Sequence, residues 1–215
     1  MSSSEMGREV RDMQRKPRGR PREFDREAAL KSAMDVFWAK GFDACSMTDL
    51  VDAMGINSPS LYAAFGSKED LYREAIALYA DTEGGEALRQ FQAHASVRDA
   101  LRAMFRASVE LYTGTREPRG CMVFLGAMSV GAGHAQLRAE MQKRRRKVAS
   151  IVAARLARGV EKGELDARTD VPALAALCMT LFAGLSIQAQ DGVSRKALFA
   201  AIEQFIATLP VRVKR

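Results

Sequence analysis

The sequence is poor in the residues that build disulfide frameworks, zinc sites and catalytic triads. Its 215 residues include three cysteines and two histidines. No two cysteines form a C-x-x-C pair, so we expect neither a disulfide framework nor a zinc site, and we expect a reducing, cytoplasmic compartment. No carboxylate–histidine motif lies near either histidine, which argues against metal catalysis and a Ser-His-Asp triad. The sequence therefore predicts no enzymatic activity, no cofactor and no metal.

Long apolar runs are also missing. Residues 1–21 contain no apolar stretch and do not have the pattern of a signal peptide. The most apolar segment, residues 174–187, spans 14 residues, fewer than the roughly 18 of a membrane helix. We interpret this segment as a buried helix and expect no membrane partner.

Acidic residues are outnumbered by basic residues, 26 to 33, which gives a formal net charge of +7. Such an excess favours an anionic partner, whether nucleic acid, a membrane surface or an acidic ligand. Apolar residues make up 47% of the chain, enough for a packed core, and the length allows one or two domains.

Strand-like alternation is absent, whereas apolar residues recur at helical spacing. We expect an all-α protein in which three short helices precede longer ones, with a possible break or bend of the first long helix at Gly84 and Gly85. The composition changes near residue 75, which predicts a small N-terminal module on a larger helical body. The longer helices are expected at residues 67–91, 96–113, 119–130, 134–162, 170–190 and 194–209.

A short turn, Gly55-Ile56-Asn57, joins the second and third short helices. A three-residue turn that contains glycine is typical of a helix-turn-helix. The other side of the third helix carries small and hydroxylated residues, which suits a helix that enters a major groove. The packed faces of the two helices are expected to consist of Met47, Leu50, Val51, Met54, Leu61 and Phe65.

Helix starts in this module carry signals for phosphate. Ser46 and Asp49 form an S-x-x-D capping box that places Thr48 in the first turn of the second helix, where free N–H groups attract phosphate. Ser58 is expected to cap the third helix. Lys68 opposes the dipole at the start of the next helix, and an external phosphate would explain its place. The predicted DNA contacts in the module are Thr48, Ser58, Pro59, Ser60, Tyr62, Ala63 and Lys68.

A basic stretch precedes the module. Residues 15–22 are mostly basic, contain no acid, and include proline and glycine that keep the chain extended. In such an arm, Arg18, Arg20 and Arg22 would fit the minor groove of DNA. A disordered tail that improves solubility is the alternative.

Residues 19–76, about a quarter of the chain, resemble the TetR family of bacterial transcription regulators. The resemblance implies a homodimer with one helix-turn-helix per subunit, which reads a palindromic operator. It implies three parts: a flexible basic arm at 1–23, a DNA-binding domain at 24–72, and an effector-binding and dimerisation domain at 73–215. Ala63 and Ala64 are small where some relatives carry larger groove-reading side chains. The matching pattern consists of Phe37, Gly41-Phe42, Ser46, Gly55, Ser60-Leu61-Tyr62, Phe65, Lys68 and Leu71.

Two apolar stripes lie in the last two predicted helices. The resemblance implies that these helices pair with their copies in a four-helix dimer bundle, although a core within one subunit would give the same stripes. The first stripe contains Leu174, Leu177, Cys178, Leu181, Phe182 and Leu185, and the second contains Leu198, Ile202, Phe205, Ile206 and Leu209.

The resemblance does not identify the effector. Methionine and aromatic side chains line sites for apolar ligands of varied shape, but they also build ordinary cores. The candidates for an effector pocket are Met104, Phe105, Tyr112, Cys121, Met122, Phe124, Leu125, Met128 and Phe182.

The segment Gly120–Gly126 is apolar on all sides and resembles a Gly-Cys-Met/Leu segment of several TetR subgroups. Cys121 is predicted at a helix N-terminus beside Arg119, a position that favours the reactive thiolate and so the sensing of oxidants or electrophiles. Cys45 also precedes a helix and is a second redox candidate. The alternative is that both cysteines are small buried hydrophobic residues.

Five consecutive basic residues, Lys143–Lys147, give residues 138–158 a charge of +7, from eight basic and one acidic side chain. Three interpretations stay open: a solvated face, a clamp for an anionic ligand, or an added DNA contact.

Together, the features of the sequence and the resemblance predict a dimeric repressor that a small molecule releases from its operator. The alternative function is a non-specific nucleoid protein that uses the basic arm.

Overall fold

The structure is a computed structural model that describes residues 24–115 and 117–211. Within these ranges the chain forms ten α-helices, one 3-10 turn and no strand, which confirms the all-α prediction. The predicted arm residues Arg18, Arg20 and Arg22 lie outside the described residues. The helices are α1 (Arg26–Lys40), α2 (Met47–Met54), α3 (Ser58–Phe65), α4 (Lys68–Asp81), α5 (Glu86–Ala93), α6 (Val97–Tyr112), α7 (Met122–Ser129), α8 (Ala135–Glu161), α9 (Val171–Gln190) and α10 (Arg195–Ala207).

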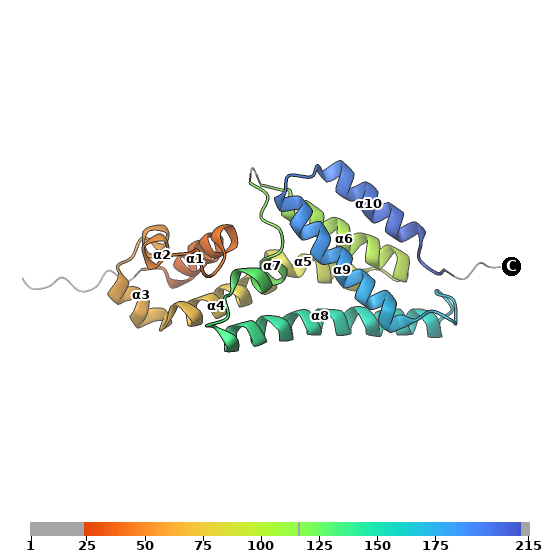
Figure 1. Cartoon of the computed structure of the whole chain (residues 1–215), viewed down its shortest axis with the longest axis horizontal. Coiled ribbons are helices and arrows are strands. Elements are labelled where there is room, and N and C mark those ends of the chain that lie inside the picture. The colour runs from red at the N-terminus through yellow and green to blue at the C-terminus, as the bar shows by residue number, and fades with distance from the viewer. Residues whose placement is uncertain (1–23, 116, 212–215) are drawn as a thin grey trace, which may run out of the picture.

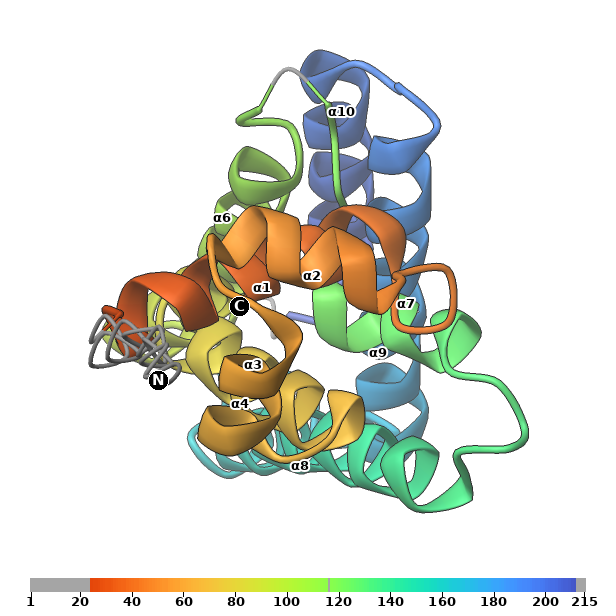
Figure 2. The same ribbon diagram turned by 90° about the vertical axis from the view of Figure 1, so that its left-hand side faces the viewer.

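The molecule is elongated, with α1, α2 and α3 gathered at one end and α6, α8, α9 and α10 at the other (Figure 1). α4 leaves the three-helix module and runs into the body, where α8 extends beneath it. Figure 2 looks onto the module end and shows α7 between the module and α9. α4 therefore belongs structurally to both parts.

Caps on the helices of the module follow the sequence closely, with one exception. The predicted capping boxes are present: Ser46 pairs with Asp49 at α2, and Ser67 pairs with the third residue of α4. The prediction that Ser58 caps α3 is wrong. The cap is Asn57, whose side chain accepts a hydrogen bond from the Ser60 backbone N–H at 2.9 Å, and Ser58 is the first helical residue.

The predicted helix 67–91 is broken. α4 ends at Asp81, the 3-10 turn Glu83–Gly85 follows, and α5 begins at Glu86. A Cβ at Gly84 would lie 2.2 Å from Cε1 of Tyr79, so the close approach of the turn to the α4 tyrosine requires glycine. The break turns the chain back toward α6, against which α5 packs.

One hydrophobic core runs through both parts of the molecule. In the body, Phe105 of α6 is fully buried and meets Phe182 of α9 at a ring-centroid distance of 6.2 Å and Phe205 of α10 at 5.6 Å. Burying such a side chain contributes about 1.5–3 kcal/mol. These aromatic contacts hold α6, α9 and α10 together.

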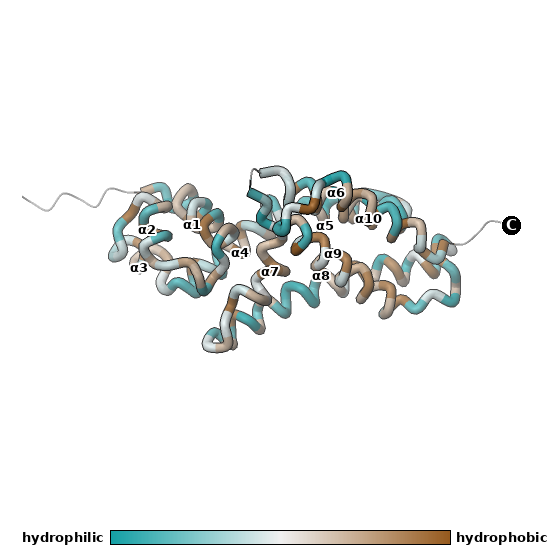
Figure 3. Tube along the Cα trace, turned by 45° about the horizontal axis from the view of Figure 1, so that its top comes forward, coloured by the Kyte–Doolittle hydropathy of each residue, from teal (hydrophilic) through white to brown (hydrophobic). Residues whose placement is uncertain are grey.

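α9 departs from the buried helix that the sequence predicts. It is long and apolar enough to cross a membrane by length and composition alone, yet 28% of its most apolar stretch is buried in the single chain. Leu177 is 49% exposed and Ile187 is 41% exposed, while Cys178 and Leu185 on the opposite side are buried. In Figure 3 much of α9 is brown, that is, hydrophobic. One face of α9 thus packs inside the subunit and another faces outward.

Candidate DNA interface and effector cavity

The helix-turn-helix is built as the sequence predicts. Gly55 ends α2 in the left-handed conformation, with φ 65°, and its N–H bonds back to the carbonyl groups of α2. Leu50 of α2 and Leu61 and Phe65 of α3 are buried. The two helices therefore share a packed face, and the opposite side of α3 is free to face outward.

The outward face of α3 carries four exposed residues: Ser58, Pro59, Tyr62 and Ala63. They recur at i, i+1, i+4 and i+5, so they share one side of the helix. Tyr62 is 52% exposed, and a large aromatic side chain on such a surface is available to a partner rather than to the core.

The other three predicted DNA contacts in the module are Thr48, Ser60 and Lys68. Thr48 is exposed in the first turn of α2, while Ser60 is half-buried. Lys68 is half-buried, with its Nζ 4.6 Å from the ring centroid of Phe42. This cation–π contact gives the charge at the α4 N-terminus an explanation within the chain. A phosphate is therefore not needed to account for its position.

The sequence did not indicate two cationic side chains that fix the module. Arg26 of α1 donates to the Ala64 carbonyl at 3.2 Å and to the Glu74 carboxylate at 2.8 Å. Lys40 pairs with Asp49 at 2.7 Å, and hydrogen bonds from Lys40 and Ser46 lower the pKa of Asp49 to about 2. These contacts hold α2 and α3 against α1 and α4.

A cavity of about 300 Å³ lies within the body, and six helices contribute to its wall. Four of the nine side chains predicted for an effector pocket line it: Met104, Cys121, Phe124 and Phe182. The volume is at the lower end of the range for small-molecule sites. The other lining residues are Tyr79, Ala80, Asp81, Gly84, Ala87, Leu88, Val123, Arg144, Lys147, Val148 and Ile151.

The remaining five predicted pocket residues lie elsewhere. Phe105 and Tyr112 are buried in the core beside the cavity. Met122 and Leu125 line a different groove of about 240 Å³, between α1 and α7. Met128 is 68% exposed at the far end of α7 and borders the same groove. The sequence placed the whole apolar segment at one site, but α7 turns alternate sides toward the cavity and toward α1.

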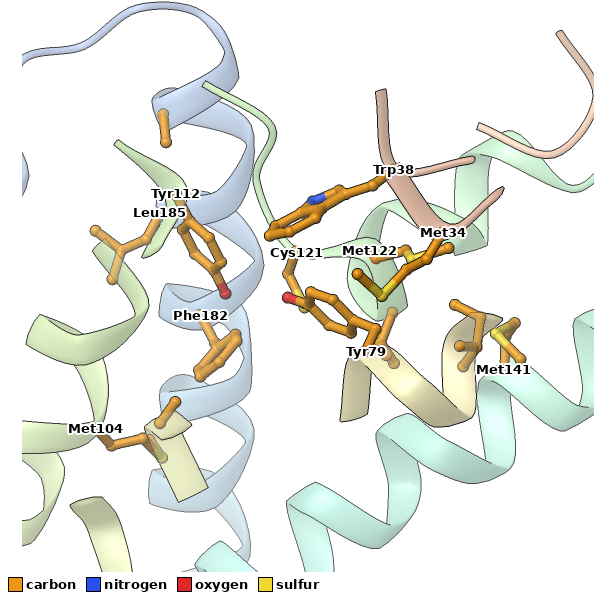
Figure 4. Close-up of a cluster of buried hydrophobic side chains, with 14 of the residues drawn as sticks. Met34, Trp38, Tyr79, Met104, Tyr112, Cys121, Met122, Met141, Phe182 and Leu185 are labelled. Atoms are coloured by element: carbon orange, nitrogen blue, oxygen red, sulfur yellow. The ribbon is translucent and has the colours of Figure 1, made fainter. Parts of the chain in front are cut away.

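Cys121 lies where the cavity meets the core, immediately before α7 (Figure 4). The Tyr79 hydroxyl donates to its Sγ at 3.6 Å, and its backbone N–H donates to the Ser186 Oγ at 2.7 Å. Burial raises the pKa of Tyr79 well above its ordinary value, so the phenol keeps its proton and remains a donor. Tyr79 was not singled out in the sequence, although it continues the buried i, i+3, i+4 pattern of α4.

The other two cysteines have different surroundings. Cys45 is 1% exposed, and burial raises the pKa of its thiol. Cys178 is fully buried, and burial raises the pKa of its thiol to about 12. Since the thiolate is the reactive form, these environments oppose the redox role predicted for Cys45. Cys121 alone among the three lines the 300 Å³ cavity.

The segment that leads into α7 is bonded to the DNA-binding module. The Trp38 Nε1 of α1 donates to the Gly120 carbonyl at 2.8 Å, and its ring meets Tyr79 edge-on with centroids 4.9 Å apart. Arg119 pairs with Asp35 of α1 at 2.8 Å. Figure 4 shows Trp38, Tyr79 and Cys121 converging at this point.

The far end of α7 contacts the module as well. The Asp43 N–H donates to the Ser129 carbonyl at 3.0 Å, and the Tyr72 hydroxyl bonds to the Ser129 side chain. A Cβ at Gly41 would lie 2.6 Å from the Cβ of Ser129, so α1 and α7 approach closely. α7 therefore bridges the cavity and the DNA module. In the part of the chain that the structure describes, no group of three His, Cys, Asp or Glu side chains is placed to hold a metal ion.

Comparisons with known proteins agree with this architecture. The family described as "Bacterial regulatory proteins, tetR family" matches residues 29–75, and "Tetracyclin repressor-like, C-terminal domain" matches residues 98–209. The chain belongs to the TetR family. This confirms the resemblance seen in the sequence. Members of this family are transcription regulators and not enzymes.

Several TetR-family proteins are similar over most or part of the chain. The transcriptional repressor ComR of Escherichia coli is 32% identical over 93% of this chain and 96% of its own. The Escherichia coli repressor BdcR is 38% identical over 52% of this chain and 56% of its own. A cysteine variant of the regulator CifR, in complex with 26-base-pair operator DNA, is 39% identical, with a TM-score of 0.83 over 89% of this chain and all of its own.

Proposed function

We propose that this TetR-family protein is a homodimeric, cytoplasmic repressor that binds a palindromic operator and leaves it when a small molecule occupies the body. The observation that carries the proposal is the exposed face of α3, Ser58, Pro59, Tyr62 and Ala63, on a helix-turn-helix of the expected geometry. The structure of the similar regulator CifR contains operator DNA, and ComR and BdcR are named repressors.

The outward face of α9 supports a dimer. Leu177 and Ile187 are exposed there, and a Cβ at Gly184 would meet no atom within 4 Å. Exposed apolar residues beside small ones allow two helices to approach closely. A two-fold axis through this face would pair α9 and α10 with their copies and present two α3 helices to one DNA face. Such an arrangement also explains why only 28% of the most apolar stretch of this helix is buried within one subunit.

The effector site in this proposal is the cavity beside Cys121, and its signal passes through α7. A ligand that forces apart the cavity wall displaces the segment 119–121. This segment is bonded to Trp38 and Asp35 of α1, so the displacement changes the position of the module. An electrophilic effector would attach to the Cys121 sulfur. The coupling between the two sites is reciprocal, so operator DNA weakens the binding of the effector by the same factor.

The alternative function, a non-specific nucleoid protein, differs in its dependence on sequence and salt. We propose to select genomic DNA fragments with the purified protein at about 200 mM salt, where binding through phosphates alone is weakened. A shared palindrome among the recovered fragments supports a specific dimeric regulator. Recovery of fragments without a common motif contradicts it and favours the nucleoid protein.

A further inference from the structure

The basic run Lys143–Lys147 of α8 is divided among three environments. The Arg145 Nη1 donates to the Val123 carbonyl at 3.1 Å and so joins α8 to α7. Lys143, Arg146 and Lys147 are exposed, and Arg144 is half-buried. Arg144 and Lys147 line the cavity beside Cys121. The run is therefore not one solvated face, and two of its cations belong to the candidate effector site.

The face of α8 that lines the cavity contains Arg144, Lys147, Val148 and Ile151, at i, i+3, i+4 and i+7. It places two cations on the same wall as two aliphatic side chains. Opposite helices supply apolar side chains: Met104 of α6, Phe124 of α7 and Phe182 of α9. The rings of Phe124 and Phe182 are stacked with centroids 4.9 Å apart, which gives the cavity a flat aromatic wall.

The two cations have no carboxylate partner in the subunit as described. No ion pair joins Arg144 or Lys147 to a carboxylate within 4.0 Å, although Arg73, Arg102, Arg119 and others form such pairs. Asp81 is the single acid among the residues that line the cavity, and it forms no ion pair with either cation. The site thus holds an excess of positive charge beside apolar surface, and this charge attracts an anion.

We propose that the effector of this protein is a small amphipathic anion, an apolar or aromatic body that carries one carboxylate-like group. The apolar part of the ligand lies against Phe124 and Phe182, and its anionic group pairs with Arg144 and Lys147. The inference rests on the proposed function, because it names the class of ligand that this effector site takes. It also assigns a role to a basic run for which the sequence left three interpretations.

Two alkylating reagents of similar size test this charge preference at Cys121. Iodoacetate is an anion and iodoacetamide is neutral. With either reagent, the cysteine sulfur forms a bond to the methylene carbon, the carbon–iodine bond breaks, iodide leaves, and the thiol proton passes to solvent. The rate at Cys121 is measured by mass spectrometry of the peptide that contains it, and the iodoacetate-to-iodoacetamide rate ratio is divided by the ratio for free cysteine.

The double variant Arg144→Gln/Lys147→Gln is compared with Lys143→Gln/Arg146→Gln, which removes the same charge from the part of the run that does not line the cavity. We expect the normalised ratio to fall about fivefold or more in the cavity variant, because the attraction of two nearby cations is lost. The control variant is expected to stay within twofold of the unmodified protein. Equal ratios in the two variants would overturn the proposal.

A second probe separates this inference from thiol chemistry and from DNA release. 8-Anilinonaphthalene-1-sulfonate is an aromatic anion whose fluorescence rises in apolar sites, and its binding needs no reactive cysteine. We expect its Kd to rise about fivefold in the cavity variant and to be unchanged in the control. This result would stand even if alkylation of Cys121 left operator binding intact. An equal Kd in the cavity variant and the control contradicts an anion site.

Discussion

The DNA module and the effector cavity differ in how their residues are gathered. The proposed DNA surface comes from one stretch, residues 48–68, whose positions are set by helix caps and a glycine turn. The cavity collects side chains between residues 79 and 182, from six packed helices. A surface made from one stretch can change residue by residue. A cavity made from many helices transmits a change to its neighbours, because packed cores are not freely deformable.

The two regions depend on each other most through the proposed dimer, so disruption of this dimer has the largest expected effect. Leu177→Arg/Ile187→Arg places two charges on the outward face of α9 without disturbing the buried side. We expect monomers in sedimentation, and operator affinity about a hundredfold lower, because two linked modules gain strongly from binding together.

The matched control for the α9 variant is Ala139→Arg/Ala154→Arg, which adds the same charges at exposed positions of α8. This control should remain dimeric and bind the operator at least as tightly as the unmodified protein. A dimer that survives the α9 substitutions would show that the subunits pair through another face.

Removal of the exposed aromatic side chain of α3 tests the module alone. Tyr62→Ala should weaken operator binding by roughly 1–3 kcal/mol, the usual loss for a good groove contact. The free energy of unfolding should change by no more than about 0.5 kcal/mol, since the side chain is 52% exposed. Binding isotherms and urea unfolding supply the two values, with Gln92→Ala in the body as control. Unaltered operator affinity would remove Tyr62 from the interface.

The link between the regions is tested at Trp38. Trp38→Phe keeps an aromatic ring against Tyr79 but removes the N–H that donates to the Gly120 carbonyl. The unpaired buried carbonyl should lower stability by about 1–3 kcal/mol. Operator affinity before alkylation should stay unchanged. The loss of operator-binding free energy on alkylation of Cys121 should be less than about half of the loss in the unsubstituted protein. An undiminished loss of operator affinity on alkylation of this variant would show that the modification of Cys121 reaches the module through other contacts.

The smallest effect concerns acid stability of the module. The folded pKa of Asp49 is about 2, below the value of about 4 in an unfolded chain. Its contact with Lys40 therefore adds stability above pH 4 and loses this effect as the pH falls toward 2. Asp49→Asn should lower Tm slightly at pH 6 and by a smaller amount at pH 2, whereas Asp52→Asn on the same helix should lower it at neither. A Tm difference as large at pH 2 as at pH 6 would contradict the ion-pair explanation.

The DNA module was easier to predict from the sequence than the cavity, because its residues come from one stretch of the chain. The Gly55 turn and the boxes at Ser46 and Ser67 are local signals, so the module was predicted almost to the residue. The cap of α3 was misplaced by one residue because serine and asparagine both cap well. Four of the nine predicted pocket residues line the cavity. The other five lie elsewhere, because periodicity finds apolar faces but cannot say which neighbour each face meets.

Tertiary contacts also account for the residues that the sequence missed. Tyr79 lies in the same buried pattern as Tyr72 and Ile76, and its contact with Cys121 joins residues 42 positions apart. The division of the basic run between solvent and cavity depends on how α8 rotates against α7 and α9, which no local pattern records. An apolar stripe looks the same in a subunit core and in a dimer interface, so the sequence alone could not say which part of α9 faces outward.

The proposed route from Cys121 to the DNA module is tested by measuring operator affinity before and after alkylation of this cysteine. The protein is treated with iodoacetamide, modification of Cys121 is confirmed by mass, and binding to the selected operator is measured. Cys121→Ser serves as control, since it retains the site without the nucleophile. We expect alkylation to lower the affinity tenfold or more in the unsubstituted protein and to leave it unchanged in Cys121→Ser. Equal affinity with and without the modification at Cys121 would contradict it.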